Sequence, residues 1–594
     1  MERTEIQTQL KWKTEDIFAS DEAWEEEFKA VEREYGAYDF SVFENSFTDK
    51  TKLLECLRLS DTISRRMEKL YLYAHLSHDV DLRDSAKTAA MARISSLFSK
   101  IFASLAFVEP QLTALPDETL QAYIADPDFA EYDYRLERVL AGKAHVLSAA
   151  EEKLLTLGSE VMGGFRDVFM MLDNANLNLP KATLKGEEVQ MSHGTYGVAL
   201  RTGTKEERKE WFEKYYAAYI KLIDAITQTY YNNVKKNVFY KTVRGFDSCM
   251  AMAMHGEDVQ PVVYENLLKA THDALPIMHE YISLRKTALH MDEQHMYDVY
   301  VPLVKNAELA LDFDAAYELV VKGLAPLGED YQNLLKKGKA ERWIDVCENA
   351  GKRSGAYSSS VYDSPHPYVL LNYQPTISDV FTVAHEMGHA LHSYKSSKAQ
   401  PYAKADYTIF LAEIASTVNE VLLLKHLLKE TTDKNFKKYL LNYYMDMIRA
   451  TLFRQTQFAE FEQLAHAKVE AGEALTKETL CDLYYGLNKQ YYGEGLVHDK
   501  EIAYEWARIP HFYTAFYVYK YATGIISAIS IVKRILTEGE SAVQDYFTFL
   551  SSGGCTTPVE ILKKAGVDLT TQAPFEVAMS EFKATLDEFK RLLD

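Results

Sequence analysis

Cysteine is scarce in this sequence and shows no pairing pattern. The 594 residues include five cysteines, an odd number, and no two of them form a CxxC pair. They are Cys56, Cys249, Cys347, Cys481 and Cys555. This pattern indicates neither a thiolate metal site nor a disulfide framework. We therefore expect free thiols in a chain that works in a reducing compartment.

Net positive charge and long apolar runs are also lacking. Lys and Arg number 66 against 87 Asp and Glu, which gives a formal net charge of −21. Nucleic acid and anionic membrane surfaces require a basic patch, so neither is an expected partner. Residues 1–16 contain no apolar core of a signal peptide, and the longest apolar stretch, 524–532, is too short to span a bilayer. We expect a cytoplasmic protein of unknown oligomeric state.

The chain has neither a fixed-period repeat nor a low-complexity linker, which argues against a solenoid. Apolar residues recur instead at the three- and four-residue spacing of amphipathic helices. Helices are predicted in this way for 53–76, 147–172, 205–231, 263–291 and 510–536. A possible hairpin in 181–200 and β-forming residues in 356–373 predict a small sheet. We expect a mainly α protein, divided near residue 200 into regions 1–200 and 201–594.

One segment, 378–392, holds a sharp chemical motif, HEMGH at 385–389. Its apolar residues recur at helical spacing, which predicts a helix that faces the core on one side. Ser378 is the expected N-cap of this helix. Asp379 follows it, where the positive end of the helix dipole favours a carboxylate.

The spacing of the two motif histidines suits a metal ion. On a helix, His385 and His389 project about 40° apart, so their imidazoles can fill two corners of a zinc tetrahedron. Glu386 lies beside them, where its carboxylate can take a proton from the attacking water. The sequence therefore predicts a zinc site with Glu386 as general base.

A catalytic zinc normally takes a third protein ligand. His392 is the nearest extra histidine, but the extended histidine motif requires Gly and His three and six residues after His389. The sequence has His392 and Lys395 there, so that class is excluded.

The other common third ligand is a Glu from a following helix, which we place at 406–430. Glu413 lies in the middle of this apolar stretch, where an unpaired carboxylate is out of place, and it is the predicted ligand. Glu420, two turns on, either orients one of the histidines or is a solvated charge.

These residues also carry a family resemblance. The segments 378–392 and 410–417 resemble the active-site pair of the oligoendopeptidase F branch of the thimet oligopeptidase-like zinc peptidases. Further similar stretches lie at 12–18, 244–299, 508–513 and 516–524. The resemblance is thus spread in order over nearly the whole chain.

This resemblance implies a two-lobed, mostly helical zincin with a small sheet beside the zinc helix and a deep internal channel. It implies one zinc per chain, held by the equivalents of His385, His389 and Glu413, and an endopeptidase that cleaves short oligopeptides. His511 and a tyrosine are expected to assist the substrate carbonyl.

Tyr521 is the first choice for that tyrosine, with Tyr513 and Tyr517 as substrate-binding candidates behind it. The strand that ends at Tyr373 precedes the zinc helix and is a candidate to hold the peptide as an added strand. Asp379, like Glu420, is a candidate for supporting the metal ligands.

Two other functions remain open. An exopeptidase on the same motif would need a charged anchor for a peptide terminus, and the sequence does not reveal one. A structural zinc would be closed by a fourth protein ligand, His392 or Glu420. Cobalt or manganese can replace zinc at His/Glu sites, and cleavage preference is not readable from the sequence.

Overall fold

The computed structural model describes residues 1–304 and 309–593. The chain forms two compact units that interleave along the sequence. Unit 1 comprises Met1–Val146, Glu308–His426 and Ile531–Val567, and unit 2 comprises Leu147–Ala307, Leu427–Ser530 and Asp568–Asp594. The division near residue 200 into two contiguous regions stays a prediction.

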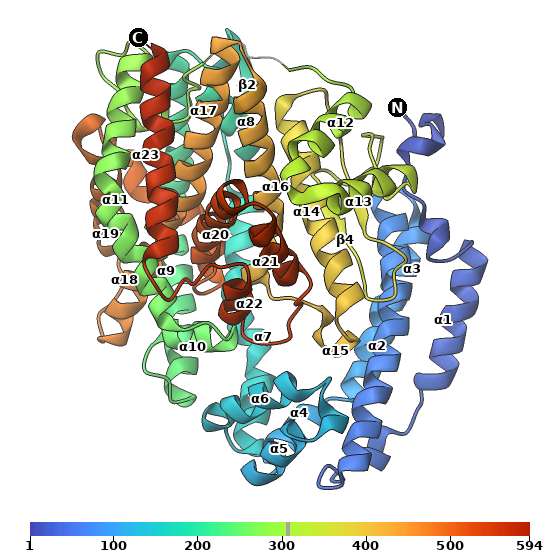
Figure 1. Ribbon diagram of the computed structural model, residues 1–594. Coiled ribbons are helices and arrows are strands. Elements are labelled where there is room, and N and C mark those ends of the chain that lie inside the picture. Colours follow the sequence, from blue (N-terminus) through green and yellow to red (C-terminus); the bar gives the residue numbers. More distant parts are fainter. Residues whose placement is uncertain (305–308, 594) are drawn as a thin grey trace. The chain divides into compact units, whose positions relative to one another are not determined.

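Helices dominate both units, which confirms the mainly α prediction (Figure 1). The helices of unit 1 are α1 (Asp21–Tyr35), α2 (Lys50–Asp79), α3 (Ser85–Ser104), α4 (Val108–Ala114), α5 (Asp117–Ile124), α6 (Asp133–Gly142), α12 (Phe313–Gly323), α13 (Gly328–Ala340), α14 (Ile377–Ala399), α15 (Tyr402–Ala405), α16 (Ile409–Glu430, assigned here up to His426), α21 (Glu540–Leu550) and α22 (Pro558–Lys564).

The helices of unit 2 are α7 (Ala149–Met171), α8 (His193–Thr202), α9 (Lys205–Val243), α10 (Cys249–Gly256), α11 (Pro261–Ala288), α17 (Lys434–Ile448), α18 (Arg454–Glu470), α19 (Lys477–Tyr492), α20 (Tyr519–Glu538, assigned here up to Ser530) and α23 (Ala573–Leu593). Three of the five helices predicted from periodicity match α2, α7 and α11 closely, and the fourth, 205–231, starts with α9 but ends twelve residues before it does. The fifth, 510–536, is wrong at its start, because a 3₁₀ turn occupies Pro510–Tyr513 and α20 begins at Tyr519.

Strands are few and short. In unit 2, β1 (Lys181–Leu184) and β2 (Glu187–Gln190) form the predicted antiparallel hairpin, with Lys185 and Gly186 at positive φ in its turn. The rest of that predicted strand segment is α8, which starts with a capping box between Ser192 and Thr195.

In unit 1, β3 (Ile344–Asp345), β4 (Tyr357–Ser359) and β5 (Tyr368–Leu370) form a three-stranded sheet. Its order is β3-β5-β4, with β5 parallel to β3 and antiparallel to β4. Both edges of β5 are therefore occupied. The prediction that the strand ending at Tyr373 accepts a peptide as an added strand is therefore wrong for β5, and the two edge strands are β3 and β4.

A buried ion pair anchors this sheet to the N-terminal segment. The Asp345 carboxylate accepts bonds from Lys352 Nζ (2.7 Å) and from Arg3 Nη2 (2.7 Å), and the Lys352 side chain is fully buried. Burial by itself raises the pKa of Asp345, but the two cations outweigh it and hold the pKa below its usual value. The pair thus contributes stability above the unfolded-state pKa and loses it as pH falls through the folded-state pKa.

Asp345→Asn should lower the melting temperature at neutral pH, because it leaves a buried lysine without a counter-charge, a loss of about 3–5 kcal/mol. Thermal unfolding of both proteins between pH 7 and pH 3 checks this. The gap between them should narrow as the wild-type carboxylate is protonated. A gap that widens toward acid pH would contradict the assignment.

The N-terminal part of the chain contains a longer apolar stretch than 524–532. Ser85–Ala114 has the length and composition to cross a membrane: an 18-residue window within it has a mean hydropathy of 1.4, and 28% of that window is buried. It forms two helices, α3 and α4, with residues 105–107 between them, and Ile94, Leu97 and Ile101 contribute to the core of unit 1. Core helices pass the same test, so the absence of a membrane partner stays a prediction. The five cysteines are free, as predicted.

Candidate metal centre

The helix that carries the HEMGH motif is capped by a different residue from the one predicted. α14 begins at Ile377, and its N-cap is Thr376, whose hydroxyl accepts a bond from the Asp379 N–H. The Asp379 carboxylate in turn accepts from the Thr376 hydroxyl and the Gln374 N–H. Ser378 is thus wrong as the cap. Asp379 is engaged at the helix start, six residues before His385, and a role toward the metal stays a prediction.

α14 and α16 run side by side and touch at a glycine (Figure 1). A Cβ on Gly388 would lie 2.6 Å from Ser416 Cα and 2.7 Å from the Ala415 carbonyl oxygen. Nearby, the buried Asn419 side chain donates to the Ala384 carbonyl (3.0 Å), and Tyr331 of α13 donates to Asn419 Oδ1 (3.0 Å). These close contacts set the separation of the two helices that carry the expected metal ligands.

The three predicted metal ligands come together. His385 Nε2 and His389 Nε2 lie 3.1 Å apart, and Glu413 Oε2 lies 3.5 Å and 3.6 Å from them. Donor atoms about 2.1 Å from a tetrahedral zinc are about 3.4 Å from one another. His385, His389 and Glu413 therefore form a group with the spacing of three corners of a zinc tetrahedron.

The other ring nitrogens leave these Nε2 atoms available. His385 Nδ1 donates to Glu420 Oε1 over 2.6 Å, and the His389 ring bonds to the backbone of Ala412. Burial lowers the pKa of His385, but the Glu420 bond and the nearby carboxylates outweigh it and raise the pKa to about 9. For His389, burial and the charge of His385 lower the pKa to about 3. Glu420 is thus hydrogen-bonded to the His385 ring, as its predicted role of orienting a histidine requires.

Glu386 is buried beside this group, with 7% of its surface exposed. Its Oε2 has no hydrogen-bond partner within the part of the chain that the structure describes. Burial raises its pKa to about 7, with Glu413 and Glu420 adding to the rise against His385. A buried carboxyl with one uncommitted oxygen and a pKa near neutrality has the properties of a general base.

His392 does not belong to the group. Its ring is buried and stacks on Tyr407 at 3.7 Å, one turn beyond His389. Tyr373 lies after β5, and its hydroxyl donates to the Leu311 carbonyl (2.8 Å) while its ring packs edge-on against Phe313. Both side chains are held by packing in unit 1, and substrate binding by Tyr373 stays a prediction.

The candidate assisting residues lie in unit 2. The His511 and Tyr517 rings stack with centroids 5.9 Å apart, and Tyr521 Oη lies 3.5 Å from His511 Nε2. Tyr513 is separate: it is buried, and its ring stacks on Phe169 at 4.5 Å. The structure thus groups His511, Tyr517 and Tyr521, which we call the His511 cluster, and leaves Tyr513 in the core.

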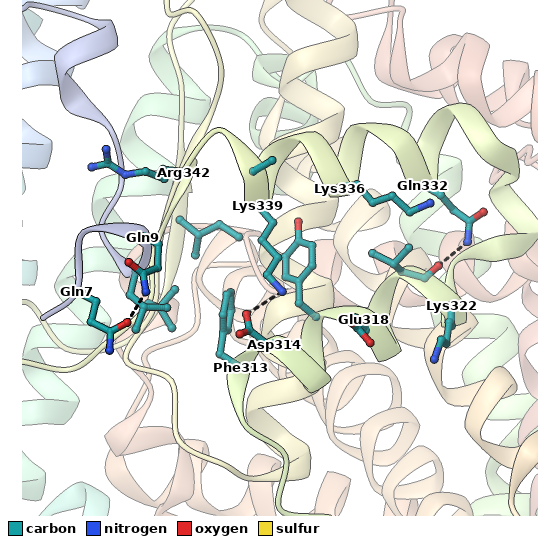
Figure 2. Close-up of a pocket in the computed structure, with 16 residues that line it drawn as sticks. Gln7, Gln9, Phe313, Asp314, Glu318, Lys322, Gln332, Lys336, Lys339 and Arg342 are labelled. Carbon is teal, nitrogen blue, oxygen red and sulfur yellow. Dashed lines mark hydrogen bonds and ion pairs between the residues drawn. The ribbon is translucent and has the colours of Figure 1, made fainter.

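A cavity of about 860 Å³ opens elsewhere in unit 1, between α12 and α13 (Figure 2). Tyr317, Val321 and Ile344 contribute its apolar wall, and Lys339 reaches from α13 to Asp314 of α12 at 2.8 Å. None of the three donor residues lines it. The position of this cavity therefore does not indicate the metal site, which is identified by the spacing of the donor atoms.

Gly388→Ala should weaken metal binding by more than tenfold. The added methyl group overlaps the backbone of α16, so the helices must separate and carry Glu413 away from the histidines, at about 1–3 kcal/mol of overpacking. Metal affinity and melting temperature check the effect. Gly158→Ala, in an open position of α7, is the matched control and should be harmless. Unchanged affinity in Gly388→Ala would show that the contact does not set the site.

Comparisons with known proteins show to which family the chain belongs. Residues 199–581 match the model of peptidase family M3, and residues 111–178 match its oligopeptidase F N-terminal model. The chain is 41% identical to the oligopeptidase PepF of Bacillus subtilis, covering 100% of this chain and 88% of that one. It is 37% identical to the group B oligopeptidase PepB of Streptococcus agalactiae, covering 100% and 98%.

Solved structures give the same result. A peptidase from Chlamydophila abortus superposes with a TM-score of 0.93 at 35% identity, over 100% of this chain and 99% of that one. Oligoendopeptidase F from Enterococcus faecium superposes with a TM-score of 0.73 at 33% identity, over 96% and 97%. With the His385, His389 and Glu413 group in place, the chain is a metallopeptidase and belongs to peptidase family M3.

Proposed function

We propose that this protein is a zinc-dependent endopeptidase that hydrolyses internal peptide bonds of short oligopeptides. The observation that carries the proposal is the triangle of donor atoms from His385, His389 and Glu413, with the buried Glu386 beside it. One zinc ion per chain suits two imidazole nitrogens and one carboxylate oxygen. The pKa of about 9 means that His385 is protonated at neutral pH without the ion, and zinc binding would release that proton. The relatives are named oligopeptidases and oligoendopeptidases, which supports oligopeptides as the substrate class.

Zinc held by these residues would polarise the scissile carbonyl and make the attacking water more acidic. Glu386 accepts the proton of that water and passes it to the leaving amine. Burial suits Glu386 for both steps, because a pKa near neutrality lets it hold and release a proton. Glu420 keeps His385 oriented through the Nδ1 bond.

For substrate binding we assign β4. It is one of the two edge strands of its sheet and packs against α14, so a peptide added along it would run beside the motif helix. The other edge strand, β3, is flanked by backbone bonds to residues 10–13. Main-chain bonds to an added strand give affinity with little sequence selectivity, which suits an enzyme for varied oligopeptides.

We assign His511 and Tyr521 to stabilising the developing oxyanion, because their polar atoms lie 3.5 Å apart and both are donors that such a charge needs. Burial, with the nearby Arg454 charge, lowers the pKa of His511, so its ring is neutral at neutral pH and retains one N–H donor. The Tyr517 ring stacks on His511 and forms one side of the His511 cluster. The net charge of −21 argues against nucleic acid and anionic membranes as partners. We assign the protein to the cytoplasm, with short peptides as its partners.

The test is cleavage of an internally quenched peptide blocked at both ends, with the cut position read by mass spectrometry. We expect internal cleavage that stops with a chelator and returns with zinc. An exopeptidase would leave this peptide intact and cleave only its unblocked version, which would overturn the internal-bond assignment. Zinc at one per chain without cleavage across a varied peptide set would overturn hydrolysis itself and favour a structural ion.

A further inference from the structure

The chain makes a turn at Phe516, between the 3₁₀ turn Pro510–Tyr513 and α20. Phe516 has φ of 53°, in the left-handed region. For a bulky side chain this conformation is strained, and it persists only where the surroundings impose it. Something in unit 2 must therefore hold Phe516 in place.

Two buried polar side chains tie the segment down. Glu462 of α18 is fully buried, and its Oε1 accepts a bond from the Phe516 N–H over 2.8 Å. Four residues earlier along the segment, the buried Asn233 of α9 donates to the Phe512 carbonyl over 3.2 Å. The Phe516 ring is itself buried and lies 4.9 Å from the His466 ring. Residues 512–516 are thus hydrogen-bonded to both α9 and α18.

The turn at Phe516 is what assembles the His511 cluster. Six residues in extended conformation would span about 20 Å, yet the His511 and Tyr517 rings stack with centroids 5.9 Å apart. Tyr517 is covered from another direction by Lys520 Nζ, 4.6 Å from its ring, and Lys520 pairs with Glu257. The position of Tyr517 against His511 therefore depends on the turn at Phe516.

The Glu462 carboxylate bonds to the Phe516 N–H through Oε1. Its Oε2 is buried and has no hydrogen-bond partner among the residues that the structure describes. Burial raises its pKa to about 8, against the Phe516 bond and Lys520, so the side chain is mostly neutral at pH 7. Gln is consequently a close substitute that keeps the acceptor oxygen, whereas Met keeps the volume and removes the acceptor.

We propose that Glu462 is a positioning residue that holds Phe516 in its left-handed conformation and thereby fixes Tyr517 and Tyr521 against His511. The inference rests on the proposed function, in which the His511 cluster acts on the substrate. It adds to that function two residues, Glu462 and Phe516, that touch neither the metal group nor the assisting side chains' polar atoms.

The first experiment compares Glu462→Met with Glu462→Gln on the blocked peptide. Glu462→Met should lower kcat about 10–100-fold, since small displacements of assisting groups have effects of this size. Zinc content should stay at one per chain, and Glu462→Gln should retain kcat within about threefold. Glu460→Met is the control: Glu460 lies on the same helix but bonds His272 and Tyr491, so its loss should lower stability and leave kcat unchanged. Full kcat in Glu462→Met would overturn the proposal.

The second experiment is a double-mutant cycle with Phe516→Gly, measured as melting temperature of the metal-free protein and as kcat. Glycine adopts positive φ without strain, so the loss from Glu462→Met should be smaller in the Phe516→Gly background. Strict additivity would overturn the coupling. If wild-type protein fails to cleave peptides, the proposed function fails, whereas the melting-temperature cycle still decides whether Glu462 holds Phe516.

Discussion

Glu386→Gln should lower kcat by about 10²–10⁴-fold and leave bound zinc unchanged. Glutamine preserves the shape of the side chain, but an amide does not accept the proton of the attacking water. The three donor atoms belong to other residues, so metal affinity has no reason to change. Steady-state kinetics on the blocked peptide and metal analysis of the same preparation measure both quantities.

Glu386→Asp is the useful companion variant. It keeps a carboxylate but withdraws it by one methylene, so kcat should fall to a value between those of the wild type and Glu386→Gln. Turnover by Glu386→Gln within a few-fold of the wild type would remove Glu386 from the role of base. Loss of zinc from the same variant would instead indicate that its carboxylate supports the metal.

Glu413→Ala should weaken zinc binding by more than the 10–100-fold that loss of a ligand's hydrogen-bond partner typically costs. Two imidazoles remain, and a two-ligand site has a far lower affinity than a three-ligand site. The Glu413 side chain is 40% exposed, so its truncation opens no buried cavity. The metal-free variant should therefore melt at the wild-type temperature, and competition with a chelator measures the affinity.

Glu420→Gln is the matched control for this experiment. Its amide oxygen can still accept the His385 Nδ1–H bond, so zinc affinity should fall less than in Glu413→Ala. Normal zinc affinity in Glu413→Ala, with a large loss in Glu420→Gln, would make Glu420 the third ligand.

The chemistry of the site was predictable because it depends on spacing within single helices. His385 and His389 are one turn apart in any helix, and the apolar context of Glu413 singles it out in α16. The start of α8 was also readable, since Ser192 and Thr195 form a capping box, but β-forming residues earlier in the segment favoured a strand.

Features that depend on distant residues were not predictable. The position of β5 between β3 and β4 arises from pairing with two other segments, and its own residues do not encode which edges are filled. The break at Phe516 is similar. Apolar spacing through 510–536 favours one helix, whereas the left-handed turn requires Glu462, 54 residues earlier. Gly388 lies in the motif, yet its contact with Ser416 appears only when the two helices are packed.

The interleaving of the two units has a consequence for synthesis on the ribosome. Unit 1 needs 531–567 for completion, and within it Phe549 of α21 covers the His392 ring at 5.2 Å while Phe547 stacks on Tyr331. At about 5–20 residues per second, this segment is complete roughly 7–27 s after α16 has been made. During that interval the nascent chain carries the metal ligands on helices whose apolar backing is absent. Holdase chaperones would bind the exposed apolar surface of these helices. A chain released before residue 567 should yield an insoluble fragment.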